Sequence, residues 1–189
     1  QANEEILVNR RRLIELRRRL NEGERMSPVD RLWLIVMAEQ YRVKRGELMA
    51  LLKRVDIVPP SIALAQGAEE SGWGTSRFVR EGNAIFGEWT FTRSGSLMPA
   101  RRDQDKAHRI KAFGSLLDSV RTYALNLNTH RAYRKFRTTR LGLRQQGAPM
   151  DGTKLIDGLR SYSERGKNYV KSLRSIIAVN EFRHLDDAR

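Results

Sequence analysis

The stretch PPSIALAQGAEESGWG, residues 59–74, decides how this chain is organised. Its two prolines break the preceding segment and open a helix, which the sequence predicts from Ser61 to Glu70. Most residues of that helix are small and apolar, and the pair Ser71-Gly72 ends it. A helix of this composition that finishes in two adjacent carboxylates and a Gly-Trp-Gly turn is the sharpest local feature of the sequence.

The two carboxylates suit acid catalysis. In the last turn of a helix a carboxylate faces the negative end of the macrodipole, which disfavours its charged form. The neighbouring carboxylate acts in the same direction, as would burial against Trp73. A raised pKa at Glu70 or Glu69 is what a glycosidase general acid needs, because it must hold a proton near neutral pH. A solvated pair of glutamates at a helix end gives the same pattern.

Around this segment the sequence predicts a mainly helical protein with one small β-lobe. Apolar residues at helical spacing predict helices over residues 3–20, 28–41 and 46–54, and others that begin near residues 115, 132, 155 and 169. Between Ile85 and Phe113 the alternation has period two, with strands expected at 89–92 and 109–113 and a turn at 94–96. A cleft between a helical lobe and a β-lobe is a natural groove for a polymer chain.

The composition narrows the class of protein. A chain of 189 residues with 40% hydrophobic and 31% charged residues has the size and make-up of one folded domain, with room for an appendage. It has no cysteine and three widely spaced histidines, so we expect neither a catalytic metal nor any other cofactor. No apolar run approaches the roughly 20 residues of a membrane-spanning helix, and no signal peptide opens the sequence.

The net charge of +14 predicts attraction to polyanions: nucleic acid, an anionic membrane face or an acidic wall polymer. The sequence contains no helix-turn-helix, zinc or single-strand-binding signature, so we expect no nucleic-acid partner. A basic surface that merely keeps the protein soluble explains the charge as well. One predicted helix face is expected to be solvated or to dock an acidic wall polymer, and it carries Arg131, Arg134, Lys135, Arg137 and Arg140.

Two motifs, in this order, give the chain a family resemblance. ESGWG at residues 70–74, followed by NAIFG at 83–87, resembles the paired signature of bacterial N-acetylglucosaminidases of the autolysin and flagellar muramidase-like type. Within that family, longer phrases are similar to the Bax-type proteins of Gram-negative bacteria, namely RVDIVPPS at 54–61, NLNTHRAY at 126–133 and YSERGKNYV at 162–170. The likeness extends from about residue 30 to about residue 180, and several phrases in order are more specific than any single motif.

The resemblance implies a lysozyme-like fold and hydrolysis of β-1,4 bonds between amino sugars of peptidoglycan. In that family the residue that matches Glu70 is the general acid, which agrees with the electrostatic interpretation. The family pattern also implies that Asn83, Phe86 and Gly87 line the groove under the sugar. The tyrosine that matches Tyr162 lies in the family's catalytic cleft, although a core aromatic with a satisfied hydroxyl is the plainer interpretation.

A second catalytic carboxylate is harder to place. Glycosidases usually use a base or nucleophile across the scissile bond, and glucosaminidases of this type often place a glutamate in the β-lobe. Glu88 is the catalytic candidate there because it follows NAIFG directly, although strand alternation can turn it either way. Asp103 is expected to contact substrate, and it and Asp105 also suit a solvated loop. Without a positioned carboxylate, the substrate's acetamido group can act as nucleophile, or an intramolecular attack can give an anhydro-sugar.

Aromatic residues near the two motifs are candidates for stacking on sugar faces. Trp73, Trp89 and Phe91 are the nearest, and we expect one or two of them to touch substrate. Tyr123, on the helix after the β-lobe, is also expected to contact substrate. Rings in a β-lobe belong more often to the core, which is the alternative for each of them.

The sequence thus predicts a helical extension over residues 1–54 that braces the core, a lysozyme-like glucosaminidase domain over 55–182, and a frayed tail over 183–189. We predict a periplasmic or cell-envelope peptidoglycan hydrolase that cuts next to N-acetylglucosamine and has glycan strands as its partner. The alternatives among enzymes are a lytic transglycosylase and a muramidase. The alternative of another class is a non-catalytic basic module that holds an anionic polymer.

Overall fold

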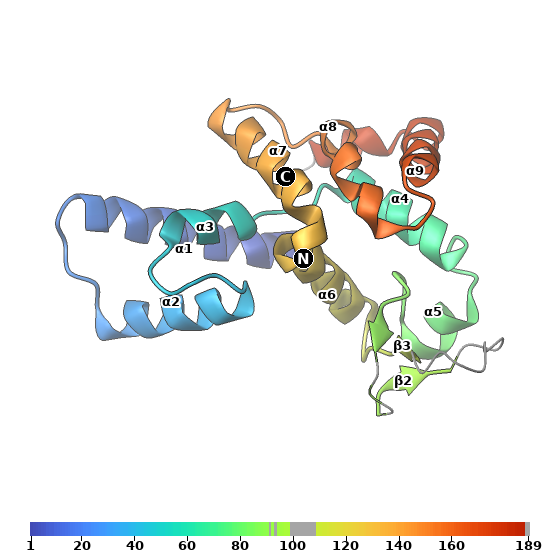
Figure 1. Ribbon diagram of the computed structural model, residues 1–189, viewed down its shortest axis with the longest axis horizontal. Helices are drawn as coiled ribbons and strands as arrows, with labels where there is room; N and C mark the ends of the chain where they lie inside the picture. The colour runs from blue at the N-terminus through green and yellow to red at the C-terminus, as the bar shows by residue number, and fades with distance from the viewer. Residues whose placement is uncertain (91, 93, 99–108, 188–189) are drawn as a thin grey trace.

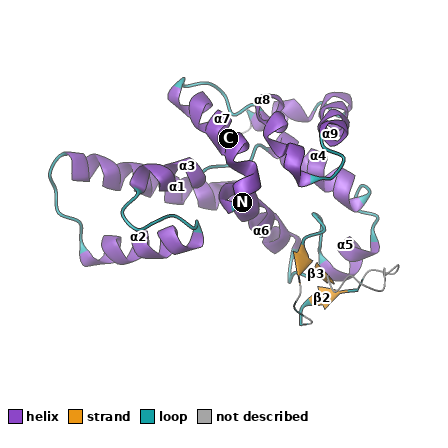
Figure 2. Ribbon diagram, viewed as in Figure 1, coloured by secondary structure: helices purple, strands orange, loops and turns teal. Residues whose placement is uncertain are grey.

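The computed structural model of the chain describes residues 1–90, 92, 94–98 and 109–187. Helices dominate it, and the strands form one small sheet at the edge of the helical body (Figures 1 and 2). The predicted fold class, a mainly helical domain with a small β-lobe, is confirmed. Two of the residues with expected roles, Phe91 and Asp103, lie outside the described residues, as does Asp105.

The elements follow one another in a simple order. The α-helices are α1 (Ala2–Asn21), α2 (Pro28–Gln40), α3 (Leu48–Arg54), α4 (Pro60–Ser71), α5 (Arg77–Gly82), α6 (Leu116–Thr129), α7 (Arg134–Gln145), α8 (Gly152–Leu155) and α9 (Lys167–Val179). The 3-10 helices are η1 (Arg131–Tyr133), η2 (Ile156–Tyr162) and η3 (Phe182–Asp186). The strands are β1 (Trp89–Thr90), β2 (Ser96–Leu97) and β3 (Arg109–Lys111).

The first three helices form an arm that extends from the rest of the molecule (Figure 1). Asn3 joins the start of α1 to the chain before α4, because its side chain exchanges two hydrogen bonds with the backbone of Val58 at 2.8 and 3.2 Å. Arg10 donates to the carbonyls of Leu52 and Val55 at 2.5 and 2.8 Å. These bonds attach the inner end of α1 firmly to the core.

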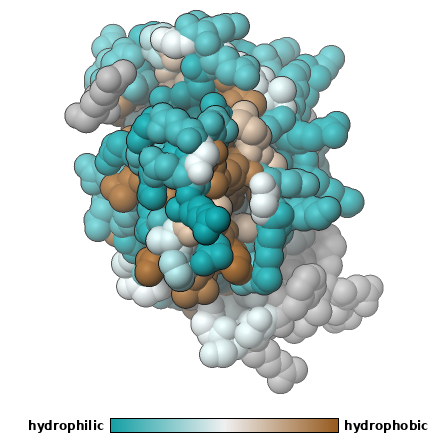
Figure 3. All heavy atoms as spheres, turned by 90° about the vertical axis from the view of Figure 1, so that its left-hand side faces the viewer, coloured by the Kyte–Doolittle hydropathy of each residue, from teal (hydrophilic) through white to brown (hydrophobic). Residues whose placement is uncertain are grey.

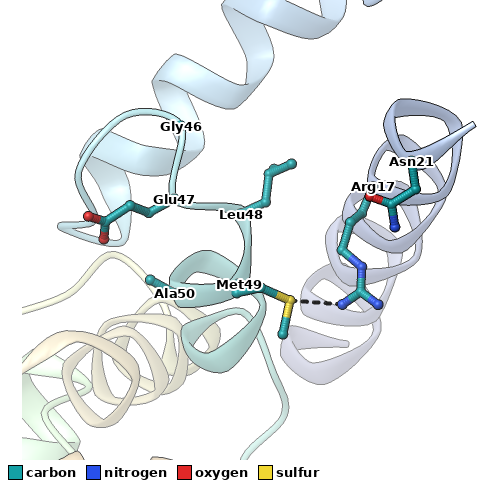
Figure 4. Close-up of a pocket in the computed structure, with 7 residues that line it drawn as sticks. All are labelled: Arg17, Asn21, Gly46, Glu47, Leu48, Met49 and Ala50. Atoms are coloured by element: carbon teal, nitrogen blue, oxygen red, sulfur yellow. Dashed lines mark hydrogen bonds between the residues drawn. The ribbon is translucent and has the colours of Figure 1, made fainter. Parts of the chain in front are cut away.

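The outer part of the arm exposes apolar surface. Val29, Leu32 and Val36 share one face of α2, and 70%, 64% and 53% of these residues are exposed. Figure 3 looks at this end of the molecule and shows apolar residues in a strip between hydrophilic ones. A pocket also opens between the end of α1 and the start of α3, where Arg17 contacts the sulfur of Met49 at 2.9 Å (Figure 4).

Asp56 is the centre of a buried charge cluster between the arm and α7. Arg144 makes two hydrogen bonds to its carboxylate at 2.9 and 3.1 Å, and Arg10 approaches to 3.4 Å. Arg140 is fully buried and donates to the backbone carbonyls of residues 53, 54, 56 and 57. Burial opposes the charge on Asp56, but these arginines hold the pKa of its carboxyl below the usual value.

The expectation of a solvated arginine face on α7 is therefore wrong for part of that face. Arg140 and Arg137 point into the protein, with 0% and 4% of each residue exposed. Arg137 donates to the carbonyls of Leu127 and His130 at 2.8 and 2.9 Å, at the end of α6. Both arginines use their donors to satisfy backbone carbonyls in the interior, so they are not available to an outside polymer.

The β-lobe is an antiparallel sheet in the order β1-β3-β2. Ile110 of β3 lies opposite Trp89 on one side and Leu97 on the other. β2 occupies part of the segment expected to be only a turn, because Ser96 and Leu97 pair with β3 instead of ending the hairpin. The short helix α5 was not predicted from the pattern; Ser76 caps it by accepting a bond from the backbone N–H of Val79.

Helix α4 lies against α8, α9 and η3 and is buried over most of its length. The end of the chain helps to fix it, which corrects the expectation of a frayed tail for the described residues. The carboxylate of Asp186 accepts hydrogen bonds from the backbone N–H and the hydroxyl of Ser61 at 2.9 and 2.7 Å. It also accepts from the backbone N–H of Gly152 at 2.8 Å, so one side chain caps the starts of α4 and α8.

Candidate active site

The turn after α4 holds Glu70 at the helix end. Gly72 and Trp73 both adopt positive φ angles, 57° and 59°, so the chain leaves the helix through a left-handed turn. Ser71 fastens this turn: its hydroxyl donates to the carbonyl of Gly67 at 2.5 Å and accepts from the backbone N–H of Gly74 at 2.7 Å. The ESGWG motif therefore has a structural reason for its serine and glycines next to the glutamate.

Glu70 is open to solvent on one side and packed on the other. Tyr169 of α9 donates its hydroxyl to Oε1 of Glu70 at 2.7 Å. Burial of the carboxyl among protein atoms raises its pKa, and the nearby charge of Glu69 adds to the effect, while the Tyr169 hydrogen bond and Arg165 oppose it. The pKa of Glu70 is thus shifted upward, the direction expected from the sequence, and burial is the main cause. Trp73, which the sequence offered as a source of this burial, is itself 60% exposed.

Glu69 is engaged elsewhere. It forms an ion pair with Arg165 and accepts a hydrogen bond from the hydroxyl of Ser172 at 3.0 Å. These partners hold the Glu69 side chain on a different side of the helix from Glu70, as the turn of about 100° between successive residues requires. Of the two glutamates, Glu70 is the one that forms no ion pair with the described residues.

Beneath Glu70 lies a buried group of polar and aromatic side chains. Gln66, four residues before Glu70 on the same helix face, donates to the Tyr169 hydroxyl at 2.9 Å. Tyr123 of α6 donates to the other end of the Gln66 amide at 2.7 Å. Phe86 stacks on Tyr123, with ring centroids 3.8 Å apart and an angle of 7° between the planes.

This packing corrects two predicted roles. Tyr123 is 1% exposed and Phe86 is 5% exposed, so neither ring presents a face to a sugar. They lie under the site and support it, and a direct substrate contact is not available to them. Gly67 brings the NAIFG motif close to α4, since a Cβ there would lie 3.1 Å from the Ile85 side chain.

Tyr162 joins the same aromatic group. Its ring stacks on Tyr169 with centroids 5.7 Å apart and packs at a tilt against Tyr133 with centroids 6.0 Å apart. Burial first, and then the charges of neighbouring groups that include Glu70 and Glu88, raise the pKa of Tyr162. The placement of Tyr162 beside the candidate acid agrees with the resemblance, and its catalytic role stays a prediction.

Glu88, the expected second carboxylate, lies close to the same tyrosines. Burial raises the pKa of Glu88 to about 7, although Lys111 opposes the shift. Burial raises the pKa of Tyr133 to about 12, and the charges of Glu70 and Glu88 add to the shift. Both carboxyls are therefore close enough to Tyr133 to act on it. Oε1 of Glu88 is buried and has no hydrogen-bond partner among the described residues. A buried carboxyl oxygen without a partner, in a group whose pKa burial raises to about 7, is typical of a functional site.

The other predicted contacts lie around this centre. Asn83 ends α5 in the left-handed conformation and uses its amide N–H to hold the carbonyl of Phe113 at 3.0 Å. Gly87 also has a positive φ, 59°, and leads into Glu88. Trp89 of β1 is 68% exposed and stays a candidate for stacking on a sugar ring, together with Trp73. The groove-lining roles of Asn83 and Gly87 remain predictions.

Two residues of the site were missed from the sequence, Gln66 and Tyr169. A polar residue four positions before Glu70, within an otherwise small and apolar helix, was a usable indication of Gln66. Tyr169 lies in the phrase YSERGKNYV, where the helical spacing of its neighbours assigned it to the core. It does belong to the core, with 1% exposed, and its hydroxyl still reaches Glu70.

The described part of the chain has no helix long and apolar enough to cross a membrane. In the same residues, no three side chains of His, Asp or Glu gather in a way that could hold a metal ion.

Comparison with known proteins agrees with the geometry. The chain is 35% identical to Protein bax of Escherichia coli over 161 residues, a match that covers 82% of this chain and 57% of that protein. The chain thus spans little more than half the length of that relative. The crystal structure of the catalytic domain of the autolysin Auto from Listeria monocytogenes matches with a TM-score of 0.52 and 17% identity, over 90% of this chain and 96% of that chain.

The family comparison covers the whole site. Residues 46–182 match the glucosaminidase family, described as mannosyl-glycoprotein endo-beta-N-acetylglucosaminidase. That range includes α4, the β-lobe and α9, which supply Glu70, Glu88 and Tyr169. The fold of the autolysin domain extends the likeness to most of the chain. The chain belongs to the glucosaminidase family.

Proposed function

We propose that this protein is a peptidoglycan hydrolase that cleaves β-1,4 bonds next to N-acetylglucosamine. The observation that carries the proposal is Glu70: a solvent-open carboxyl at the end of α4, with a raised pKa and a hydrogen bond from Tyr169. A general acid needs access to the leaving oxygen and a raised pKa that helps it to keep its proton, and Glu70 has a solvent-open position and a pKa shifted in that direction. Peptidoglycan strands are favoured over a neutral glycan because the net charge of +14 attracts a polymer with acidic stem peptides.

Glu70 acts as the general acid in this proposal. It gives its proton to the glycosidic oxygen as the C–O bond breaks, and the leaving sugar departs with a new hydroxyl. Positive charge then develops at the anomeric carbon. Glu88 is the second carboxyl, which as a carboxylate either stabilises that carbon or activates the attacking water. Its pKa of about 7 means that it carries the required negative charge above neutral pH.

Two other enzymes use a similar acid and remain alternatives. A lytic transglycosylase closes an anhydro ring on muramic acid, and a muramidase cuts on the other side of the disaccharide. The buried and unpartnered Oε1 of Glu88 favours a hydrolase over the transglycosylase, because a hydrolysing glycosidase uses two carboxyls around the bond. A glycan in the cell envelope would place the protein there, in the periplasm of a Gram-negative cell.

The exposed basic residues suit a supporting contact with the wall. Three basic residues of this face are exposed: Arg131, Arg134 and Lys135. The other two, Arg137 and Arg140, are buried. We propose that the exposed residues attract acidic stem peptides or other anionic wall polymers. Such contacts weaken as salt screens them, whereas the cleavage step itself does not depend on them.

Digestion of isolated peptidoglycan tests the proposal. The wild-type protein and Glu70→Gln are incubated with purified sacculi, and the soluble products are identified by mass spectrometry. New reducing ends on N-acetylglucosamine, absent with Glu70→Gln, support the proposal. Reducing N-acetylmuramic acid identifies a muramidase, and anhydro-muramic ends identify a transglycosylase. Binding by both proteins with no release would overturn the enzyme proposal in favour of a basic binding module.

A further inference from the structure

Three buried side chains form a line of hydrogen bonds that ends on Glu70. Tyr123 of α6 donates to Oε1 of Gln66 at 2.7 Å, and Gln66 of α4 donates from Nε2 to the Tyr169 oxygen at 2.9 Å. Tyr169 of α9 donates to Oε1 of Glu70 at 2.7 Å. The exposed fractions of Tyr123, Gln66 and Tyr169 are 1%, 0% and 1%. Side chains from α4, α6 and α9 thus meet behind the candidate acid.

The charge state of Glu70 sets the direction of this line. A carboxylate can only accept hydrogen bonds, so Tyr169 must give its single proton to Glu70. The Tyr169 oxygen then accepts from the amide N–H of Gln66, which leaves the amide oxygen facing Tyr123. Tyr123 has one proton and donates it to that oxygen. In this arrangement each polar side-chain atom of Tyr123, Gln66 and Tyr169 has a hydrogen-bond partner.

The opposite direction is possible when Glu70 is protonated on Oε1. Glu70 would then donate to Tyr169, Tyr169 to the amide oxygen of Gln66, and the Gln66 amide N–H to Tyr123. The hydroxyl proton of Tyr123 would be left with no acceptor among the described residues, in a side chain that is 1% exposed. An unpaired buried donor is destabilising. Tyr123 therefore favours one direction for the whole line.

We infer that Gln66 and Tyr123 are positioning residues: they keep the Tyr169 hydroxyl donating to Oε1 of Glu70, so that the acid proton of Glu70 resides on Oε2. Oε2 has no hydrogen-bond partner among the described residues, whereas Oε1 is engaged by Tyr169. The proton is thus kept on the oxygen that is free to meet a glycosidic oxygen. The inference rests on the proposed role of Glu70 as general acid, and Gln66 and Tyr123 act on it without touching substrate.

The variant that isolates this effect is Tyr123→Phe. It keeps the ring that stacks on Phe86 and removes only the hydroxyl. Without that donor, either orientation of the Gln66 amide leaves one of its ends unpaired, so the bias is lost. Tyr41→Phe is the matched control, because Tyr41 is 4% exposed, lies in the arm, and its hydroxyl has no hydrogen bond to the described residues. Thermal unfolding of both variants monitors the fold.

The first measurement needs no activity. The Glu70 carboxyl is titrated by ¹³C NMR in glutamate-labelled protein, with Glu70→Gln used to assign its resonance. In Tyr123→Phe the Tyr169 hydroxyl donates to the Glu70 carboxylate less often, so the titration midpoint of Glu70 rises by about half to one pH unit. Tyr41→Phe leaves it unchanged. Gln66→Met removes the amide oxygen that competes for the Tyr169 proton, so Tyr169 keeps donating to Glu70 and the midpoint does not rise; it serves if Tyr123→Phe does not fold, and a rise in Gln66→Met would contradict the inference.

The second measurement is the pH dependence of turnover. Tyr123→Phe is expected to lower kcat by about three- to tenfold, because part of the protein holds its acid proton on Oε1. KM stays within about twofold, and the basic limb of the kcat profile moves to higher pH. An unshifted Glu70 titration in Tyr123→Phe, or an equal shift in Tyr41→Phe, overturns the inference. If the wild-type protein releases no fragments, the proposed function fails, and the NMR titration still decides the role of Gln66 and Tyr123.

Discussion

Replacement of Asp56 by asparagine tests how the arm and the core are held together. Asp56 is 2% exposed and, among the described residues, is the only carboxylate within 4.0 Å of Arg10, Arg140 and Arg144. The Arg140 side chain is 0% exposed and that of Arg10 is 10% exposed, so both would lose a counter-charge in the interior. Asparagine keeps the size of the side chain and one acceptor oxygen.

The expected loss follows from burial. Breaking a buried ion pair by removing one partner costs about 3–5 kcal/mol, because the other charge stays buried without compensation. We expect about 3 kcal/mol for Asp56→Asn, at the lower end, since the Arg144 side chain is 33% exposed and can turn to water. With a urea m-value of about 2 kcal/mol/M, the unfolding midpoint falls by about 1.5 M.

Urea unfolding followed by far-UV circular dichroism measures this change. Glu39→Gln is the control. Glu39 forms an ion pair with Arg45, and the two side chains are 62% and 67% exposed, so the pair should contribute less than about 1 kcal/mol. A midpoint for Asp56→Asn within about 0.5 M of wild type would refute the reasoning. Because the arginines lower the pKa of Asp56, its contribution is complete above the unfolded value of 3.8 and disappears as the pH falls through the folded value. The gap between wild type and variant should therefore narrow below pH 3.8.

Three further changes probe the site and its support. Tyr169→Phe removes the hydrogen bond that stabilises the Glu70 carboxylate, so the pKa of Glu70 and the basic limb of the pH–activity profile should rise by about one unit; an unchanged limb would contradict this. The raised pKa of Glu88, about 7, predicts an acidic limb near pH 7 in the wild-type profile; Glu88→Gln should lower kcat/KM by about a hundredfold and abolish that limb, and an intact limb would exclude Glu88 as its source. Asp186→Ala removes three hydrogen bonds at the starts of α4 and α8, and calorimetry should show a melting temperature lower by about 5–10 °C, whereas a change below about 1 °C would mean that the tail does not support α4.

The sequence was sufficient for the helix that carries the acid. Two prolines, a run of small residues and a glycine stop predicted a helix from Ser61 to Glu70, and α4 runs from Pro60 to Ser71. These signals are local: each acts within a few residues, so they can be interpreted without the fold. β2 and α5 escaped prediction because two and six residues are too few to establish a periodicity.

The buried arginines show where pattern fails. Arg140 and Arg137 were assigned to solvent because of their residue type, yet Arg140 follows Phe136 by four residues and shares its buried face. Helix ends around residues 53–57 and 127–130 present carbonyls that need donors, and these arginines supply them. Such a need appears only when distant segments are packed together.

The site shows the same limit. Glu70 could be proposed from its own segment, because the helix end and the adjacent carboxylate are local features. Gln66 and Tyr123 are 57 residues apart, and Tyr169 is 99 residues from Glu70, so their hydrogen bonds depend on how α4, α6 and α9 pack. For the same reason the sequence could not tell that Phe86 and Tyr123 face each other instead of a sugar.

The central claim is that Glu70, and not its neighbour Glu69, is the proton donor. The measurement that tests it most directly compares kcat/KM for Glu70→Gln and Glu69→Gln on one peptidoglycan substrate, with folding checked by circular dichroism. Loss of a general acid should lower the rate of Glu70→Gln by at least about a thousandfold. Glu69→Gln weakens the pair with the exposed Arg165 and keeps an oxygen for the Ser172 hydroxyl, so it should stay within about tenfold of wild type. Near-normal turnover by Glu70→Gln, or an equal loss in Glu69→Gln, would contradict the assignment.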